Sequence, residues 1–205
     1  MNLFRVVSAD PAWTFADNLG GSKGMANPSR TGRARTVRGA AAKYAVMYNE
    51  QIMRLPVHRW VADNAVLVLW VPGAMLSTGL LVMDWWGFRQ KQIGVWAKVW
   101  TSGKRQCGMG RQMRSGCEVF LLGTRGRPQR QSKSELNIFD HRPLKPHSRK
   151  PPNLHEMLER MYPEGPFLEL FATQPRAGWT TVGLDCEGGV KADLRTWAPA
   201  AEDDR

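Results

Sequence analysis

The chain has 205 residues, of which 42% are hydrophobic, so it is long enough for one sizeable α/β domain and too apolar for global disorder. Its formal net charge is +11, its pI is near 10.1, and no Asp or Glu lies between Asp17 and Glu50. Evenly spread Lys and Arg would indicate only a solvated surface, whereas charge concentrated in this way favours a nucleic-acid partner.

The N-terminus and the cysteines predict an intracellular chain. The sequence enters "LFRVV" after two residues, which gives no sign of a secretory leader, and its three cysteines show no C-x-x-C spacing. The longest apolar run, 65–76, is interrupted by Pro72 and Gly73 and is too short to span a bilayer. We therefore expect free thiols, no membrane segment and a cytoplasmic location.

Along the chain, strand patterns alternate with helix patterns. Strands are expected over 3–7, 65–71, 88–99, 117–124, 167–172 and 179–184, and helices around 49–53, over 73–86 and over 151–162. This alternation predicts a mostly parallel sheet with helices on both faces. Residues 1–185 are expected to form a single domain, with basic loops over 14–43, 101–116 and 125–150, and 186–205 to form a polar, frayed tail.

The stretch "RVVSADPAWTF" ends a predicted buried strand with Asp10, Pro11, Ala12 and Trp13. Ligands of open α/β sheets bind beyond the carboxyl ends of the strands, which is where these residues would lie. The Asp10 carboxylate and the Pro11 carbonyl would accept the two N–H bonds of an exocyclic amine and free its lone pair for attack on a methyl sulfonium. An exposed Trp13 would stack on the base. A strand-to-loop turn whose Trp covers the core explains the same tetrapeptide.

Other chemistry-bearing residues show no comparable pattern. The histidines have no metal-ligand spacing with the cysteines, so no metal site is expected. Met109 is interpreted as a loop contact near the target strand. The remaining tryptophans of note are assigned to the core or to helix faces: Trp60, Trp70, Trp85, Trp86, Trp96 and Trp100.

The order of short motifs resembles the MT-A70 family of adenine-N6 methyltransferases, in particular its short, stand-alone phage and bacterial members. Asp-Pro-Ala-Trp stands where that family has Asp-Pro-Pro-Trp. The other matches follow in the family's order: "YAVM" (44–47), Leu-Trp-Val (69–71), Trp-Gly-Phe (86–88), Trp-x-Lys (96–98), "LLGTRGRP" (121–128), "HSRKP" (147–151) and "LELFA" (168–172). The resemblance covers residues 3 to about 185.

The resemblance implies a Rossmann-like, S-adenosylmethionine-dependent methyltransferase that is circularly permuted, with its catalytic motif before its cofactor motif. Asp10 would lie between cofactor and base, and Glu118 would brace the neighbouring loops. The cofactor side would comprise Asp10, Ser148, Lys150, Glu169, Phe171, Thr173 and Asp185. The substrate side would comprise Tyr44, which walls the base pocket, and the basic residues Lys98, Arg33, Arg35, Arg38, Arg111 and Arg114.

Three positions depart from the family's pattern. Ala12 replaces its second proline, Thr173 replaces an arginine for which Arg176 could substitute, and Leu184-Asp185 replaces an Asn-Gln or Asn-Glu pair. These changes bear on cofactor affinity more than on reaction type.

The leading interpretation is an adenine-N6 methyltransferase acting on DNA, on a flipped-out or single-stranded base, as a monomer or homodimer in a bacterial or phage-infected cell. RNA as the substrate, and a catalytically inactive nucleic-acid-binding partner of the same fold, stay open as alternatives. Loss of the cofactor in such a partner is motivated by Thr173 and Leu184.

Overall fold

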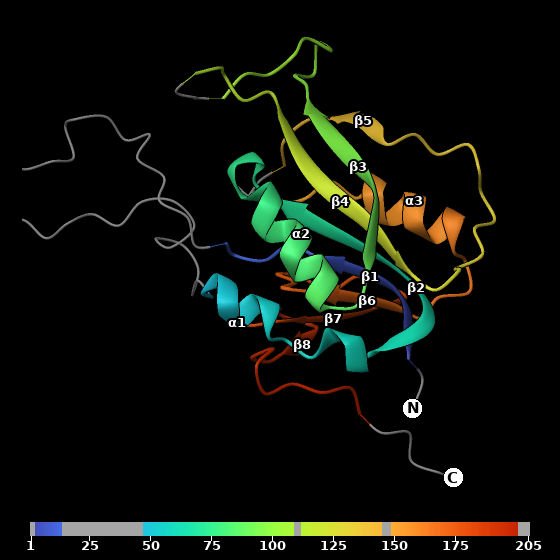
Figure 1. Cartoon of the computed structure of the whole chain (residues 1–205). Coiled ribbons are helices and arrows are strands. Elements are labelled where there is room, and N and C mark those ends of the chain that lie inside the picture. The colour runs from blue at the N-terminus through green and yellow to red at the C-terminus, as the bar shows by residue number, and fades with distance from the viewer. Residues whose placement is uncertain (1–2, 14–46, 109–111, 145–148, 201–205) are drawn as a thin grey trace, which may run out of the picture.

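The computed structural model describes residues 3–13, 47–108, 112–144 and 149–200, which form one eight-stranded sheet with helices packed on it (Figure 1). The strands are β1 (Phe4–Ala9), β2 (Val61–Val71), β3 (Arg89–Lys98), β4 (Cys117–Arg125), β5 (Ile138–His141), β6 (Phe167–Leu170), β7 (Trp179–Gly183) and β8 (Val190–Lys191). The helices are α1 (Asn49–Met53), α2 (Leu76–Trp85) and α3 (Asn153–Met161), with short 3-10 turns at Val57–Arg59 and Gly73–Met75. None of the described helices is long and apolar enough to cross a bilayer.

The strand order is β5-β3-β4-β2-β1-β6-β7-β8. Parallel pairs join β1 to β2 and to β6, β6 to β7, β7 to β8 and β3 to β5, whereas β4 is antiparallel to both of its neighbours. The mostly parallel α/β sheet expected from the sequence is therefore confirmed. All strands except β4 end at the same edge of the sheet, which we call the carboxyl edge.

Apolar side chains alternate along β1 and place one core on each face of the sheet. Val7 faces the layer of α1 and α2, where it joins Ile52 and Met83, while Val6 faces α3 and joins Leu158. Figure 1 shows α2 and α3 on opposite sides of the sheet. Each such buried side chain contributes about 1.5–3 kcal/mol of transfer free energy, so covering both faces stabilises the central strands most.

Two segments expected to be irregular contain strands. Within 125–150, residues Ile138–His141 form β5, which pairs in parallel with β3 at the edge of the sheet. Beyond residue 185 the expected frayed tail is wrong as far as the structure describes it, because β8 pairs with β7 there and Leu194 is only 3% exposed. Apolar side chains in an otherwise polar segment explain this packing, and the Trp197 ring meets the Trp60 ring edge-on at 4.9 Å.

The described parts of the basic loop, residues 101–108 and 112–116, continue the antiparallel pairing of β3 and β4 as a projecting hairpin. Lys98 donates its backbone N–H to the Gly116 carbonyl at 2.9 Å, and Gln106 donates back to the Lys98 carbonyl at 2.8 Å. In Figure 1 the hairpin extends beyond the carboxyl edge, above the label of β3. The loop therefore has a fixed, hydrogen-bonded base.

Candidate functional site

Asp10 directly follows β1, a strand with parallel partners on both sides. Its backbone N–H donates to the Leu170 carbonyl at the end of β6. Because β1 lies near the middle of the sheet, Asp10 stands at the carboxyl edge with β2 on one side and β6 on the other. Its side chain keeps 35% of its surface exposed, so the carboxylate is accessible from that edge.

A chain of alternating charges runs from Asp10 across the carboxyl edge. Lys150 Nζ lies 2.7 Å from Asp10 Oδ2 and 3.2 Å from Glu118 Oε2, and Lys98 Nζ lies 2.6 Å from Glu118 Oε1. The Lys150 ammonium also stands 5.2 Å from the centre of the Trp70 ring. Glu118 thus connects β4 to two lysines, which agrees with the expected bracing role.

Burial and opposite charges set the protonation of this cluster. Burial raises the pKa of the Asp10 carboxyl above its usual value, and the Lys150 ammonium opposes this shift. Burial alone would lower the pKa of Lys150, but Asp10 and Glu118 raise it. Burial opposes ionisation of Glu118, yet Lys150 and Lys98 hold the pKa of Glu118 below its usual value. The site therefore combines an ionised Lys150–Glu118 pair with a carboxyl of raised proton affinity.

The ends of β6 and β7 form the second part of the site. Glu169 on β6 places Oε2 3.3 Å from Nε2 of His155, a buried residue in the first turns of α3. Phe171 adopts φ +63°, a conformation rare for a non-glycine residue and one that clusters at functional sites. A Cβ on Gly183 would lie 2.1 Å from the Ala172 carbonyl oxygen, so glycine is required for this close approach.

Trp13 is buried, and the expected exposure of its indole is wrong. Its side chain is only 4% exposed, and its Nε1–H donates to the Trp70 carbonyl at 2.9 Å. Its backbone N–H donates to the Pro11 carbonyl, also at 2.9 Å, which leaves one lone pair of that oxygen for another donor. The loop folds back because the large ring gains burial against the core and its N–H finds a carbonyl at the end of β2. The turn thereby fixes the position of Pro11.

The remaining described candidates lie around this centre. Thr173 and Asp185 are exposed beyond the carboxyl ends of β6 and β7. Arg114 is exposed in the hairpin, where its guanidinium donates to the carbonyls of Cys107 and Gly108. Six predicted site residues lie outside the described part of the chain: Arg33, Arg35, Arg38, Tyr44, Arg111 and Ser148, as does Met109.

Arg176 does not take the place of the arginine that Thr173 replaces. Its Nε donates to Glu159 Oε1 at 3.0 Å, and the same oxygen accepts the indole N–H of Trp179 at 2.7 Å. Trp179 begins β7, so this contact lies at the opposite edge of the sheet from Asp10. Conversely, the sequence analysis missed His155, which lies beside Glu169. Its place next to Leu154 on the buried face of α3 could have indicated that it points into the fold.

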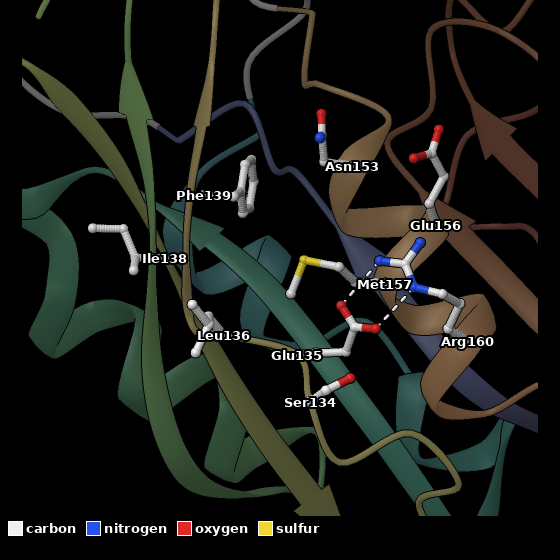
Figure 2. Close-up of a pocket in the computed structure, with 9 residues that line it drawn as sticks. All are labelled: Ser134, Glu135, Leu136, Ile138, Phe139, Asn153, Glu156, Met157 and Arg160. Carbon is white, nitrogen blue, oxygen red and sulfur yellow. Dashed lines mark hydrogen bonds and ion pairs between the residues drawn. The ribbon is translucent and has the colours of Figure 1, made fainter.

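A cavity of about 270 Å³ opens elsewhere, between β5 and α3 (Figure 2). Leu136, Phe139 and Met157 point toward one another in it, and the ion pair of Glu135 with Arg160 closes one end. This cavity lies beside the edge strand β5 and away from the ends of the central strands, and its Glu135 carboxylate is already paired with Arg160, so the charged cluster at the carboxyl edge is the better candidate. Within the described residues no three or more His, Cys, Asp or Glu side chains gather as a metal site.

The sheet, covered on both faces and charged at its carboxyl edge, is an α/β fold of the kind that binds ligands at that edge. The sequence model of the MT-A70 family matches residues 4–185. The chain therefore belongs to the MT-A70 family, a family of S-adenosylmethionine-dependent methyltransferases that act on N6 of adenine.

Three relatives show the spread of the family. The Type II methyltransferase M.MunI of a Mycoplasma species is 28% identical over 189 residues, which are 89% of this chain and 77% of M.MunI. The MT-A70-like N(6)-adenosine-methyltransferase of Arabidopsis thaliana is 25% identical over 92% of this chain and 24% of its own length. The human N(6)-adenosine-methyltransferase catalytic subunit METTL3 is 25% identical over 90% of this chain and 28% of its own. The chain thus spans about a quarter of these two longer proteins.

Proposed function

We propose that this chain transfers a methyl group from S-adenosylmethionine to N6 of adenine in DNA, with residues 1–185 as the catalytic domain. The observation that carries the proposal is the accessible, half-buried Asp10 carboxylate, held by Lys150 at the carboxyl edge of a central strand. The similarity to M.MunI, a Type II methyltransferase, supports DNA as the substrate. This similarity extends over most of both chains. The net charge of +11 suits a polyanionic substrate, whether DNA or RNA.

Asp10 and Pro11 would activate the amine. The N6 lone pair of adenine is delocalised into the ring, and two acceptors aimed at the N–H bonds favour a pyramidal, nucleophilic nitrogen. The Asp10 carboxylate supplies one acceptor, and the free lone pair of the Pro11 carbonyl supplies the other. Since burial raises the pKa of Asp10, its carboxylate is also a suitable acceptor for the proton that the alkylated nitrogen loses.

The described residues fit S-adenosylmethionine by their chemistry. Lys150 offers a cation to the carboxylate of the methionine moiety, Glu169 offers an acceptor to the ribose hydroxyls, and Phe171 offers an aromatic surface to the adenine. When bound, this cofactor supplies an electrophilic methyl group on a sulfonium. The chain's own contribution is orientation and electrostatics.

Trp13 takes a different part from the one the sequence suggested. Its two hydrogen bonds, to Pro11 and to Trp70, tie the tetrapeptide to the end of β2. We assign it to holding the two acceptors in place, while Tyr44, Arg33, Arg35 and Arg38 stay predicted contacts of the substrate.

The test incubates the purified chain with methyl-labelled S-adenosylmethionine and with single-stranded DNA, duplex DNA or RNA of one sequence. Mass spectrometry of the nucleosides is expected to find label on N6 of deoxyadenosine. Label on RNA alone would favour the RNA alternative, which the similarity to METTL3 supports. Absence of label, together with no calorimetric heat on adding the cofactor, would favour the inactive partner motivated by Thr173 and Leu184.

A further inference from the structure

Trp100 is the tryptophan that the structure exposes beside the site. The sequence favours the core or a helix face for Trp100, yet its surface is 55% exposed, whereas Trp13, the expected stacking residue, is 4% exposed. A large aromatic side chain left in water at the rim of a site costs stabilisation that burial would provide, and exposed aromatics are common anchors for ligands. The exposure of these two tryptophans is thus the reverse of the one expected from the sequence.

The charged cluster connects Trp100 to Asp10. Trp100 lies two residues beyond Lys98, the last residue of β3. Lys98 contacts Glu118, which contacts Lys150, which contacts Asp10, in steps of 2.6, 3.2 and 2.7 Å. The indole therefore stands on the same edge of the sheet as the reacting carboxylate, at the base of the projecting hairpin.

The backbone of Trp100 is held on both sides. Its N–H donates to the Lys104 carbonyl at 2.8 Å, and its carbonyl accepts the Gly103 N–H at 2.9 Å. Gly103 adopts φ +76°, which lets the chain close this tight turn. No aromatic ring of the described residues packs on the Trp100 ring. A ring on a fixed backbone loses little conformational entropy when a ligand binds it.

The charge around Trp100 selects nucleic acid as the occupant. The hairpin, 101–116, contains no Asp or Glu, and it carries the exposed Lys104 and Arg114, both of which follow the indole in the sequence. A second copy of this chain, with a net charge of +11, would be repelled there. A polynucleotide offers phosphates to the cations and a flat base to the indole.

We propose that Trp100 stacks on a base of the substrate strand next to the target adenine and so holds the strand at the rim while the target enters the site. The inference rests on the proposed function for the identity of the target. Stacking is tolerant of sequence because every base has a π face. Trp100 would therefore increase affinity without specifying the neighbouring base.

The test compares Trp100→Ala with Trp85→Ala in binding a fluorescent single-stranded DNA, without cofactor, at several salt concentrations. Trp85 is a matched control, because it is 61% exposed but ends α2 at the opposite edge of the sheet. Trp100→Ala is expected to weaken binding about tenfold, Trp100→Phe by no more than about threefold, and Trp85→Ala to bind as the unaltered chain does. The slope of log Kd against log salt should stay unchanged, because it depends on the number of phosphates that cations neutralise, and the indole neutralises none.

Three results would overturn the inference. They are unaltered binding by Trp100→Ala, a loss of the same size in Trp85→Ala, or a change of mass in sedimentation of Trp100→Ala, which would make the indole a protein contact. Failure of the proposed function is distinguishable, since it would abolish label transfer by the unaltered chain and leave this binding difference intact.

Discussion

The two edges of the sheet both carry acid–base pairs, and they differ in how the charges are arranged. At the carboxyl edge Lys150 is 15% exposed and is shared by two carboxylates, Asp10 and Glu118. At the opposite edge Arg176, 23% exposed, binds Glu159, 37% exposed, and the Trp179 indole N–H also donates to this carboxylate. The first arrangement is a connected cluster, and the second is an ordinary pair with its hydrogen bonds satisfied.

The difference between the two edges indicates that desolvation of charged groups is more costly at the carboxyl edge. Taking charges out of water is unfavourable, and an ion pair in the interior is weak evidence of stabilisation. A buried lysine shared by two carboxylates, one with a raised pKa, is therefore better explained by chemistry than by folding. The pair at the opposite edge is a single, partly exposed ion pair, for which only a small contribution to stability is expected.

The largest expected effect is that of Asp10→Asn. The amide keeps the shape of the side chain but cannot accept the proton and accepts hydrogen bonds weakly, so methyl transfer should fall by about 10²–10⁴-fold. Single-turnover transfer of labelled methyl measures it. DNA binding should stay within about twofold, and Glu159→Gln at the opposite edge is the matched control with full activity. Turnover retained by Asp10→Asn would show that the amine is activated elsewhere.

A smaller effect, sensitive to pH, is expected for Lys150→Met. In the proposed mechanism transfer requires ionised Asp10, so the rate is expected to rise as pH increases through a pKa that lies above the ordinary value of about 3.9. Because the ammonium lowers that pKa, removing it should move the acid limb of the pH–rate profile to higher pH. A pH–rate profile unchanged in position would show that Lys150 does not influence the pKa of Asp10 in solution.

The same variant should lose about 1–3 kcal/mol of unfolding free energy at neutral pH, less than for a fully buried pair, since both carboxylates keep a third of their surface exposed. The sign follows from the pKa of Lys150, which folding raises. Its stabilising contribution is present at neutral pH and is lost as pH rises through the folded-state value. Lys150 is charged at both pH 5 and pH 8, so a difference between these two pH values comes from Asp10. Removing the ammonium raises the pKa of Asp10 further, and the deficit in urea unfolding should therefore grow from pH 5 to pH 8 as the unpaired carboxyl ionises. Exposed Lys104→Met is the control.

The smallest effect is expected for Arg176→Met, about 0.2–1 kcal/mol, because both partners of this pair stay partly exposed to water. Arg176 holds the pKa of Glu159 below its usual value, so this contribution should disappear as pH falls through that value. Affinity for S-adenosylmethionine should not change, as calorimetry would show. A clear loss of affinity would restore Arg176 as a substitute for the arginine missing at Thr173.

Much of the fold could be predicted from the sequence because its signals are local. The unbroken apolar run at the end of β2 and the apolar face of α3 both indicate burial directly. β5 and β8 were missed because edge strands of four and two residues carry no periodicity to detect. Their pairing depends on partners far along the chain, β3 and β7.

The site was predictable in its residue types and less so in its contacts. Asp10 follows a strand, so its place at the carboxyl edge could be anticipated. Lys150 lies 140 residues from Asp10 in the sequence and contacts both Asp10 and Glu118. This contact depends on the order of the strands in the sheet, which no spacing in the sequence reveals. The reversed exposure of Trp13 and Trp100 also depends on tertiary packing, because the burial of an indole is decided by which parts of the chain pack against it.

Asp10 is attached to a strand whose hydrogen bonds are occupied on both sides, by β2 and by β6. A backbone fixed in this way cannot be re-aimed without breaking two ladders, so a new target would have to be accommodated by exchanging the loops that hang from the rim. Diversification in such a scaffold is then expected in the length and composition of those loops, around an acid that hardly moves.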